Sequence, residues 1–274
     1  MAFETQGSGA LDYFPCRYGK SKLLFRGPRR RLSQPYCAAI GGTETYGKFV
    51  VDPWPKLLEA RLGMPVINFG YLNAGIDVFI NEPEVATASA AAKVTVIQLM
   101  GAQNMSNRYY AVHPRRNDRF LRASNLMQTV FREVDFTEFN FTRHMLSALR
   151  QRAPERFQLL AQEMRNAWIA RMELLLRGME GKVVLLWLGE YRATAARDGL
   201  GADPVMVSPE MVAAVSPLAA ELVRVEPSFA ARLAGTKGMY HGELDAPAAS
   251  EMPGPLVHQE VSEALAPVLS RLIL

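Results

Sequence analysis

Residues 39–47 constrain the fold most, because they join a strand-like segment to a helix-like one through small residues. A short apolar segment at 36–40 runs into two glycines and Thr43, and a helix-like segment follows at 54–62. The order of strand, turn and helix is typical of α/β proteins, and it places Thr43 at the carboxyl end of a strand. Ligands of open α/β sheets bind at that edge. We therefore expect Thr43 to lie in or beside a functional site.

Strand-like and helix-like segments alternate along the rest of the chain. This alternation predicts an α/β protein with a three-layer α/β/α fold, in which a flavodoxin-like, mostly parallel sheet is covered by helices on both faces. The strand-like segments are 36–40, 65–69, 93–99 and 183–188, with weaker candidates at 205–207 and 222–225, and the helix-like segments are 56–62, 84–91 and 154–177.

The length of 274 residues suits one large α/β domain that covers residues 1–274. We expect a basic N-terminal segment at 1–35 and a helical insertion at about 117–181, which should pack beside or over the carboxyl edge of the sheet. The helix at 154–177 is the best defined, because its apolar residues recur at helical spacing. Residues 234–255 are rich in Gly, Pro and Ala and predict a long loop before a C-terminal helix.

Composition narrows the class of protein further. Apolar residues make up 49% of the chain and charged residues 21%, which is ordinary for a globular protein. No apolar run reaches the roughly 18 residues that span a bilayer, and residues 1–9 lack the features of a signal peptide. Cys16 and Cys37 show no metal-ligand spacing. These features predict a soluble cytoplasmic protein with reduced cysteines, no metal, no cofactor and no membrane partner.

Arginines are unevenly spread along a chain whose net charge is only +4. One cluster precedes the strand at 36–40, and another follows the strand at 93–99. Arginine binds carboxylate, phosphate and sulfate through paired hydrogen bonds, so the second cluster predicts an anionic ligand, a small molecule or a saccharide. A pair of solvated basic loops is the alternative, and the chain lacks a nucleic-acid motif. The candidate substrate-binding residues here are Arg108, His113, Arg115, Arg116 and Arg119.

Four blocks of the sequence, in order, resemble those of the SGNH (GDSL-type) hydrolases. Gly41-Gly42-Thr43 is similar to the first block, where a Gly-Asp-Ser turn carries the nucleophile, with Thr43 in the place of the serine. The run 65–70, with its Asn-x-Gly turn, and the run 94–104 are similar to the second and third blocks. His258 stands where the last block has its catalytic histidine. The resemblance implies that the turns at 41–43, 68–70 and 101–104 meet at one edge of the sheet.

The resemblance also implies roles for individual residues. Thr43 would be the nucleophile and His258 the base. The Thr43 N–H, a second backbone N–H and a side-chain amide would hold the oxyanion. The second N–H would come from Gly70 or Gly75, the amide from Gln103 or Asn104, and Glu44 and Asn73 are further candidates for binding substrate.

The chain departs from the SGNH pattern at two positions that matter for chemistry. Threonine replaces serine, and Pro255 occupies the place of the aspartate that orients the histidine. Glu44, Asp245, Glu251 or a backbone carbonyl could orient His258 instead. Two functions remain open: a divergent ester hydrolase or acyltransferase acting on an anionic, carbohydrate-type substrate, or a catalytically inactive binding protein that holds an anionic ligand or a protein partner. No oligomeric state follows from these features.

Overall fold

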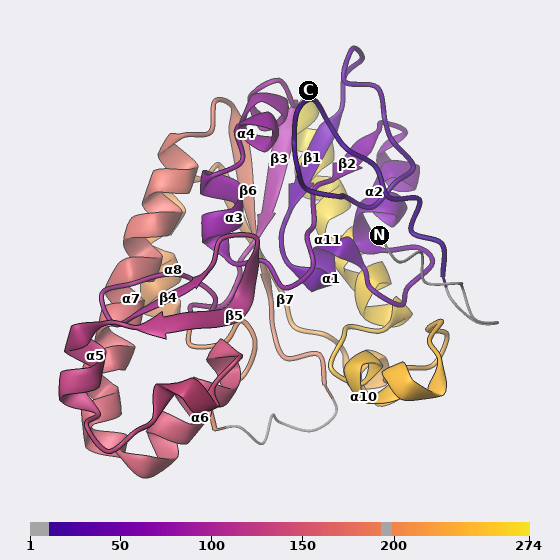
Figure 1. Cartoon of the computed structure of the whole chain (residues 1–274). Helices are drawn as coiled ribbons and strands as arrows, with labels where there is room; N and C mark the ends of the chain where they lie inside the picture. Colours follow the sequence, from indigo (N-terminus) through magenta and orange to yellow (C-terminus); the bar gives the residue numbers. More distant parts are fainter. Residues whose placement is uncertain (1–10, 193–198) are drawn as a thin grey trace.

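Five parallel strands form the central sheet of the computed structural model, which describes residues 11–192 and 199–274 (Figure 1). In sheet order, the strands are β2 (Val66–Asn68), β1 (Cys37–Ile40), β3 (Val94–Gln98), β6 (Lys182–Leu188) and β7 (Glu221–Val225). This order places the second strand before the first, as in flavodoxin-like folds, so the chain changes direction across the sheet between β1 and β3. The predicted flavodoxin-like parallel sheet is confirmed. Residues 1–10, the start of the expected basic segment, lie outside the described residues.

The strands are apolar on both faces because both faces are covered by helices. In β1, Ala38 and Ile40 join one core cluster, whereas Cys37 and Ala39 join the other. Alternate residues therefore point to opposite layers, which confirms the three-layer arrangement.

Helices from different parts of the chain make up the two outer layers. One core cluster contains buried residues of α2 (Trp54–Leu62), α9 (Phe229–Ala234) and α11 (Pro255–Ile273). The other contains residues of α3 (Ile76–Ile80), α4 (Pro83–Ala90), α7 (Pro154–Arg177) and α8 (Pro209–Val215). None of these described helices combines the length and the apolar character needed to cross a bilayer.

The segment between β3 and β6 begins with an antiparallel hairpin rather than a helix. The hairpin consists of β4 (Tyr110–His113) and β5 (Arg116–Ala123), and then follow α5 (Asn125–Val130), a short 3-10 helix (Phe136–Glu138), α6 (Thr142–Arg152) and α7. The predicted helix at 154–177 is confirmed, whereas the expected helical insertion at 117–181 was wrong over residues 117–123. Register shifts in the hairpin break the alternation of buried and exposed residues that would have marked a strand in the sequence.

Two further segments differ from their predicted form. Residues 205–207 do not form a strand. A turn lies at 205–206, the Val205 side chain is buried in the core, and the Val205 carbonyl accepts a backbone bond from the Ala102 N–H at 2.9 Å. The expected loop at 234–255 contains a 3-10 helix (Glu243–Asp245) and α10 (Ala246–Ala249). The weaker strand candidate at 222–225 is confirmed as part of β7.

Candidate functional site

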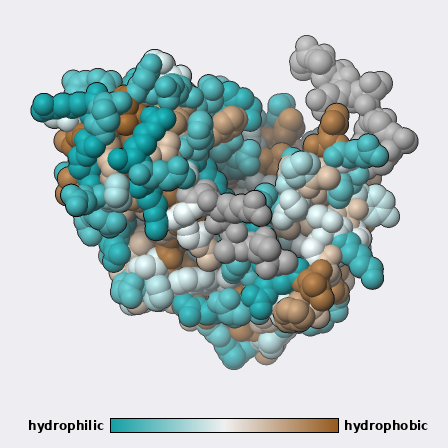
Figure 2. All heavy atoms as spheres, turned by 90° about the horizontal axis from the view of Figure 1, so that it is seen from below, coloured by the Kyte–Doolittle hydropathy of each residue, from teal (hydrophilic) through white to brown (hydrophobic). Residues whose placement is uncertain are grey.

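A cavity of about 690 Å³ lies at the carboxyl edge of the sheet. Turns that follow β1, β2 and β3 supply one side, and the rest comes from α6, Asp118, the end of β6 and the segments before α8 and α11. Seen from below, the molecule is hollowed between the side that carries α6 and the side that carries α10 (Figure 2). The polar residues that line the cavity include Thr43, Glu44, Asn73, Gln98, Gln103, Asn104, Asp118, Thr142, Arg143, His144, Ser147, Tyr191, Asp203 and Glu251.

Thr43 begins the short helix α1 (Thr43–Tyr46) directly after the turn that follows β1. Its Oγ1 accepts a hydrogen bond from the Asn73 N–H at 2.8 Å and lies 3.4 Å from Asn73 Oδ1. Asn73 has a φ of +55°, a left-handed conformation that asparagine tolerates better than most residues. Thr43 and Asn73, both expected near a functional site, therefore line the same cavity and are in direct contact.

Gly41 allows the end of β3 to approach this turn. A Cβ atom at Gly41 would lie 2.2 Å from Thr45 Oγ1 and 2.6 Å from Gln98 Oε1. Thr45 Oγ1 donates to Gln98 Oε1 at 2.5 Å, and Gln98 Nε2 donates to Glu44 Oε2 at 3.1 Å. The last residue of β3 therefore fixes the carboxylate of Glu44.

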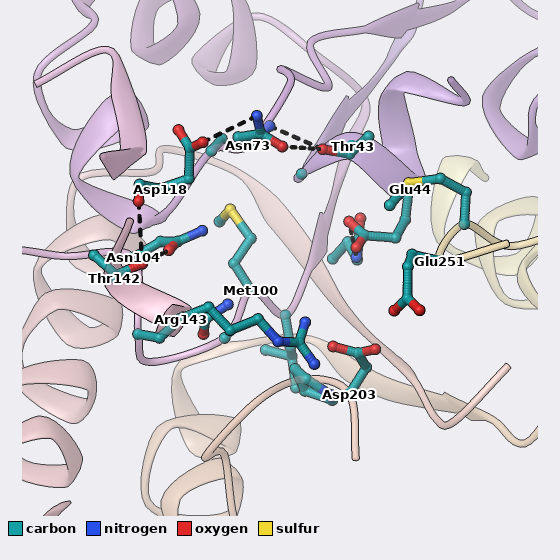
Figure 3. A pocket seen from close by; sticks show the side chains of 18 of the residues that line it. Thr43, Glu44, Asn73, Met100, Asn104, Asp118, Thr142, Arg143, Asp203 and Glu251 are labelled. Atoms are coloured by element: carbon teal, nitrogen blue, oxygen red, sulfur yellow. Dashed lines mark hydrogen bonds between the residues drawn. The ribbon is translucent and has the colours of Figure 1, made fainter. Parts of the chain in front are cut away.

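Amides and a carboxylate gather on the side of the cavity near β5 and α6 (Figure 3). Thr142 Oγ1 donates to Asn104 Oδ1 at 2.8 Å, and Asn73 Nδ2 donates to Asp118 Oδ2 at 3.3 Å. Asp118 Oδ1 is buried and has no hydrogen-bond partner among the described residues. Burial raises the pKa of Asp118. The ionised carboxylate is therefore poorly solvated on this side.

A buried guanidinium holds the acidic side of the cavity together. The Arg192 side chain is 5% exposed and forms ion pairs with Glu190 at 2.8 Å, Asp203 at 2.9 Å and Glu251 at 2.8 Å. These carboxylates come from three segments: the end of β6, the loop before α8 and the loop before α11. Asp203 and Glu251 also line the cavity.

Asp203 titrates far from the usual range of a carboxyl group. Burial raises its pKa to about 6; Arg192 and Arg143 oppose this rise, and Glu44 adds to it. In Figure 3 the Asp203 carboxylate and the Arg143 guanidinium point toward each other. The Tyr191 hydroxyl lies 3.5 Å from Glu44 Oε1, so it connects this group to the turn after β1.

The structure does not bring His258 to Thr43. His258 does not line the cavity, and its Nδ1 accepts a hydrogen bond from the Trp54 N–H at 3.1 Å. Burial, aided by the nearby Arg26, lowers the pKa of His258 to about 3. The imidazole is therefore neutral. It lies in the core because the apolar face of α11 turns it toward α2. Of its expected orienting groups, Glu44 and Glu251 line the cavity, and Asp245 is exposed.

The expected oxyanion donors divide into two groups. The Gly70 N–H donates to Asn68 Oδ1 at 2.8 Å and the Gly75 N–H to Asn117 Oδ1 at 2.9 Å, so both are engaged elsewhere and neither residue lines the cavity. Gln103 and Asn104 do line it. A Cβ at Gly75 would lie 1.7 Å from the Asn104 carbonyl oxygen, which shows how closely the turns after β2 and β3 meet.

The arginines of the expected anion site lie outside the cavity. Arg108 Nη2 pairs with Glu163 on α7 at 2.5 Å. His113 Nδ1 accepts the backbone N–H groups of Arg115 and Arg116 at 3.2 and 3.1 Å, which closes the β4–β5 hairpin. These contacts stabilise the hairpin because they satisfy its own backbone and charges.

Arg115 and Arg119, two more arginines of the expected anion site, also have other surroundings. Arg115 lines a separate hollow together with Lys20 and Lys22. The Arg119 guanidinium lies over the ring of Phe141, 5.4 Å from its centroid. Arg143, from α6, is the one arginine among the described residues that line the cavity. No group of described residues could hold a metal ion.

A model of one protein family, described as Domain of unknown function (DUF6473), matches residues 1–273. The chain belongs to this family. No curated protein matches the chain. Among solved structures, it is similar to the "Crystal Structure of the Lipase Lip_vut3 from Goat Rumen metagenome", with 12% identity and a TM-score of 0.44 over 85% of this chain and 96% of that one. The resemblance to SGNH hydrolases stays a prediction.

In this member of the DUF6473 family, several residues of the cavity and of the ion pairs that support it were missed in the sequence. Gln98 ends β3, and Glu190 and Arg192 follow the end of β6, so a systematic search for polar residues at strand ends would have found them. Asp203 and Arg143 have no such signal, because one lies in an irregular loop and the other on a helix that is polar on several sides.

Proposed function

We propose that the chain binds a polyhydroxylated small molecule of the carbohydrate type at the carboxyl edge of its sheet, without a threonine–histidine catalytic pair. The cavity of about 690 Å³ lies within the range of about 300–1,000 Å³ that is typical of small-molecule sites. Its position beside the β1–β3 switch point is where ligands of this fold class bind.

The convergence of hydrogen-bonding groups on one cavity carries this proposal. Thr43, Asn73, Asn104 and Asp118 present a hydroxyl, two amides and a carboxylate to the same space. Sugar hydroxyls both donate and accept, so they match such a mixed set. Asp118 lines the cavity, so its carboxylate adds a charged acceptor to this set. Met100 offers an apolar contact for the carbon face of a sugar ring.

Binding fits the geometry better than hydrolysis does. A hydroxyl nucleophile needs a base within hydrogen-bond reach. The contacts of Thr43 Oγ1 among the described residues are both to Asn73, one to its N–H and one to its amide oxygen, and neither group is a base. His258 is engaged with Trp54.

Ligand-observed NMR with a panel of mono- and disaccharides tests the binding proposal. We expect saturation transfer to at least one sugar, with Thr43→Val binding about tenfold more weakly because the hydroxyl is lost. Thr87→Val is the matched control, since Thr87 is exposed on α4 and does not line the cavity. Failure of the whole panel to bind the unmodified protein would contradict the proposal.

A second candidate is a divergent SGNH-like ester hydrolase or acyltransferase. The place of Thr43, at the turn after β1 and in the same cavity as the amides of Gln103 and Asn104, favours it. Short-chain acyl esters test this candidate directly. If Thr43 attacks the ester, Thr43→Ala abolishes turnover and Thr43→Ser, freed of the β-branch, retains or raises it. Turnover that is unchanged in Thr43→Ala would exclude Thr43 as the nucleophile.

A further inference from the structure

The charges around the cavity define a narrower class of ligand. We infer that the ligand carries a cationic amino group on its polyhydroxylated frame, and that this group is seated among Glu44, Asp203 and Glu251. This inference rests on the proposed function, because it assumes that the cavity binds such a frame. The inferred ligand is positively charged, whereas the sequence predicted an anionic one.

The balance of charge in the lining supports this class. Four carboxylates, those of Glu44, Asp118, Asp203 and Glu251, line the cavity against the single guanidinium of Arg143 among its described residues. Arg192 offsets part of this charge, because it pairs with Asp203 and Glu251. Glu190 pairs with Arg192 as well, so five carboxylates still stand against two guanidinium groups when these two neighbours are counted. Attraction between opposite charges grows as water is excluded, so a half-enclosed space with this balance favours a cation over an anion.

The carboxylates of Glu44, Asp203 and Glu251, which we call the acidic wall, are held in place before any ligand binds. Gln98 Nε2 holds the Glu44 carboxylate, and Arg192 holds Asp203 and Glu251. The Tyr191 hydroxyl lies 3.5 Å from Glu44 Oε1 and donates to the Glu251 carbonyl oxygen at 3.2 Å. Tyr191 and Arg192 are both buried, so these anchors are shielded from solvent. Because each carboxylate oxygen has two lone pairs, the held groups keep acceptor capacity for ligand N–H donors. A preformed site avoids the cost of ordering side chains on binding.

The protonation of Asp203 provides a way to detect a bound cation. The charged groups that act on it are Arg192, Glu44, Arg143 and Glu190, and its pKa lies above the usual range mainly because of burial. An ammonium group nearby would favour the ionised form of Asp203. Binding of an amine should therefore release a proton from this group near neutral pH, whereas binding of a neutral sugar should not.

Three probes that share one ring separate the charge from the frame: glucosamine, glucose and glucuronate. Their dissociation constants are measured by ligand-observed NMR titration of the full chain, at neutral pH and equal ionic strength. We expect glucosamine to bind about tenfold more tightly than glucose, and glucuronate to bind more weakly than either.

Two variants assign that preference to the acidic wall. Glu44→Gln keeps the shape of the side chain and should reduce the preference for glucosamine over glucose to less than about threefold. Glu155→Gln is the matched control, because Glu155 is exposed on α7 and does not line the cavity, and it should keep the full preference. Asp203→Asn provides a second, independent removal of charge.

The outcomes distinguish the inference from the proposed function. Equal binding of glucose and glucosamine, or tighter binding of glucuronate, would overturn the amino-group inference and leave the carbohydrate proposal standing. Binding of none of the three probes would overturn the amino-group inference, and failure of the wider sugar panel as well would overturn the carbohydrate proposal. A preference for glucosamine that survives in both Glu44→Gln and Asp203→Asn would show that the acidic wall is not its source, and would also overturn the inference.

Discussion

The backbone N–H of Trp54 donates a hydrogen bond to Nδ1 of His258, and this bond joins the first turn of α2 to α11. His258 is 2% exposed and Trp54 is 1% exposed. An acceptor is needed at this point, because the first N–H groups of a helix have no partner within the helix. The histidine that resembles a catalytic base in the sequence thus serves as a buried helix-capping acceptor.

Replacing His258 should therefore affect stability and leave the cavity intact. We expect His258→Ala to lower the free energy of unfolding by about 2–4 kcal/mol, because it leaves the Trp54 N–H unpaired and creates a void. His258→Asn, whose amide oxygen can accept the same bond, should lose less. Urea denaturation measures the difference. Equal losses for the two variants would contradict the capping role.

The pH dependence of stability offers a separate check on His258. Its pKa is about 3 in the folded chain and 6.5 in the reference state, so the unfolded chain binds more protons between these values. Its contribution is fully present above about pH 6.5 and is lost as the pH falls toward about 3. Compared with the unmodified protein, His258→Asn should show a flatter decline over this window in denaturation series. Parallel curves would indicate that His258 does not titrate abnormally.

Asp203 should act on stability with the opposite sign. Its pKa is raised to about 6 in the folded chain, so the folded chain binds more protons than the unfolded chain from about 3.8 upward. Its contribution is present below about pH 4 and is lost as the pH rises through about 6. Asp203→Asn should therefore gain stability relative to the unmodified protein as the pH rises, by on the order of 1–2 kcal/mol. A constant difference between the two proteins would refute this.

Replacement of the buried Arg192 should be costly for stability. Arg192→Met leaves three carboxylates without their shared partner, which we expect to cost about 3–5 kcal/mol of unfolding free energy at neutral pH. The cost should shrink in acid, because protonation removes the uncompensated charges. Arg152→Met is the control: Arg152 pairs with Glu138 at 3.6 Å on the surface, and we expect an effect below about 1 kcal/mol.

Anions should not stabilise this protein through the cavity. Arg115 and Arg116 lie at the end of the β4–β5 hairpin, outside the lining. We expect sulfate and citrate to shift the melting temperature no more than chloride does at equal ionic strength. Arg115→Gln and Arg116→Gln should leave sugar binding unchanged. A stabilisation that is specific to sulfate and is abolished in both variants would support the prediction of an anionic ligand instead.

The central fold was readable in the sequence for a physical reason. Strands buried on both faces appear as continuous apolar runs, and β1, β3 and β6 have this form. Gly41 and the helix that follows marked the carboxyl edge. The β4–β5 hairpin was not readable, because its register shifts remove the alternation that identifies a half-buried strand.

Only part of the site could be predicted from the sequence, because local sequence patterns determine neither the direction of a side chain nor the path of a loop. Thr43, Glu44, Asn73, Gln103 and Asn104 follow strands, so the topology alone brings them to one edge. A histidine in the first turns of a helix can have the same local sequence whether it faces the core or a cavity. For His258, the packing of α11 on α2 places the side chain in the core.

The two sides of the cavity differ in how freely they can change. The turn after β1 has no room for variation, since even a methyl group at Gly41 would collide with Thr45 and Gln98. Ser147, by contrast, reaches the cavity from α6, outside the five-stranded sheet. A redesign of ligand preference, by selection in nature or in the laboratory, would therefore find its adjustable positions on α6, with the strand ends as an invariant frame.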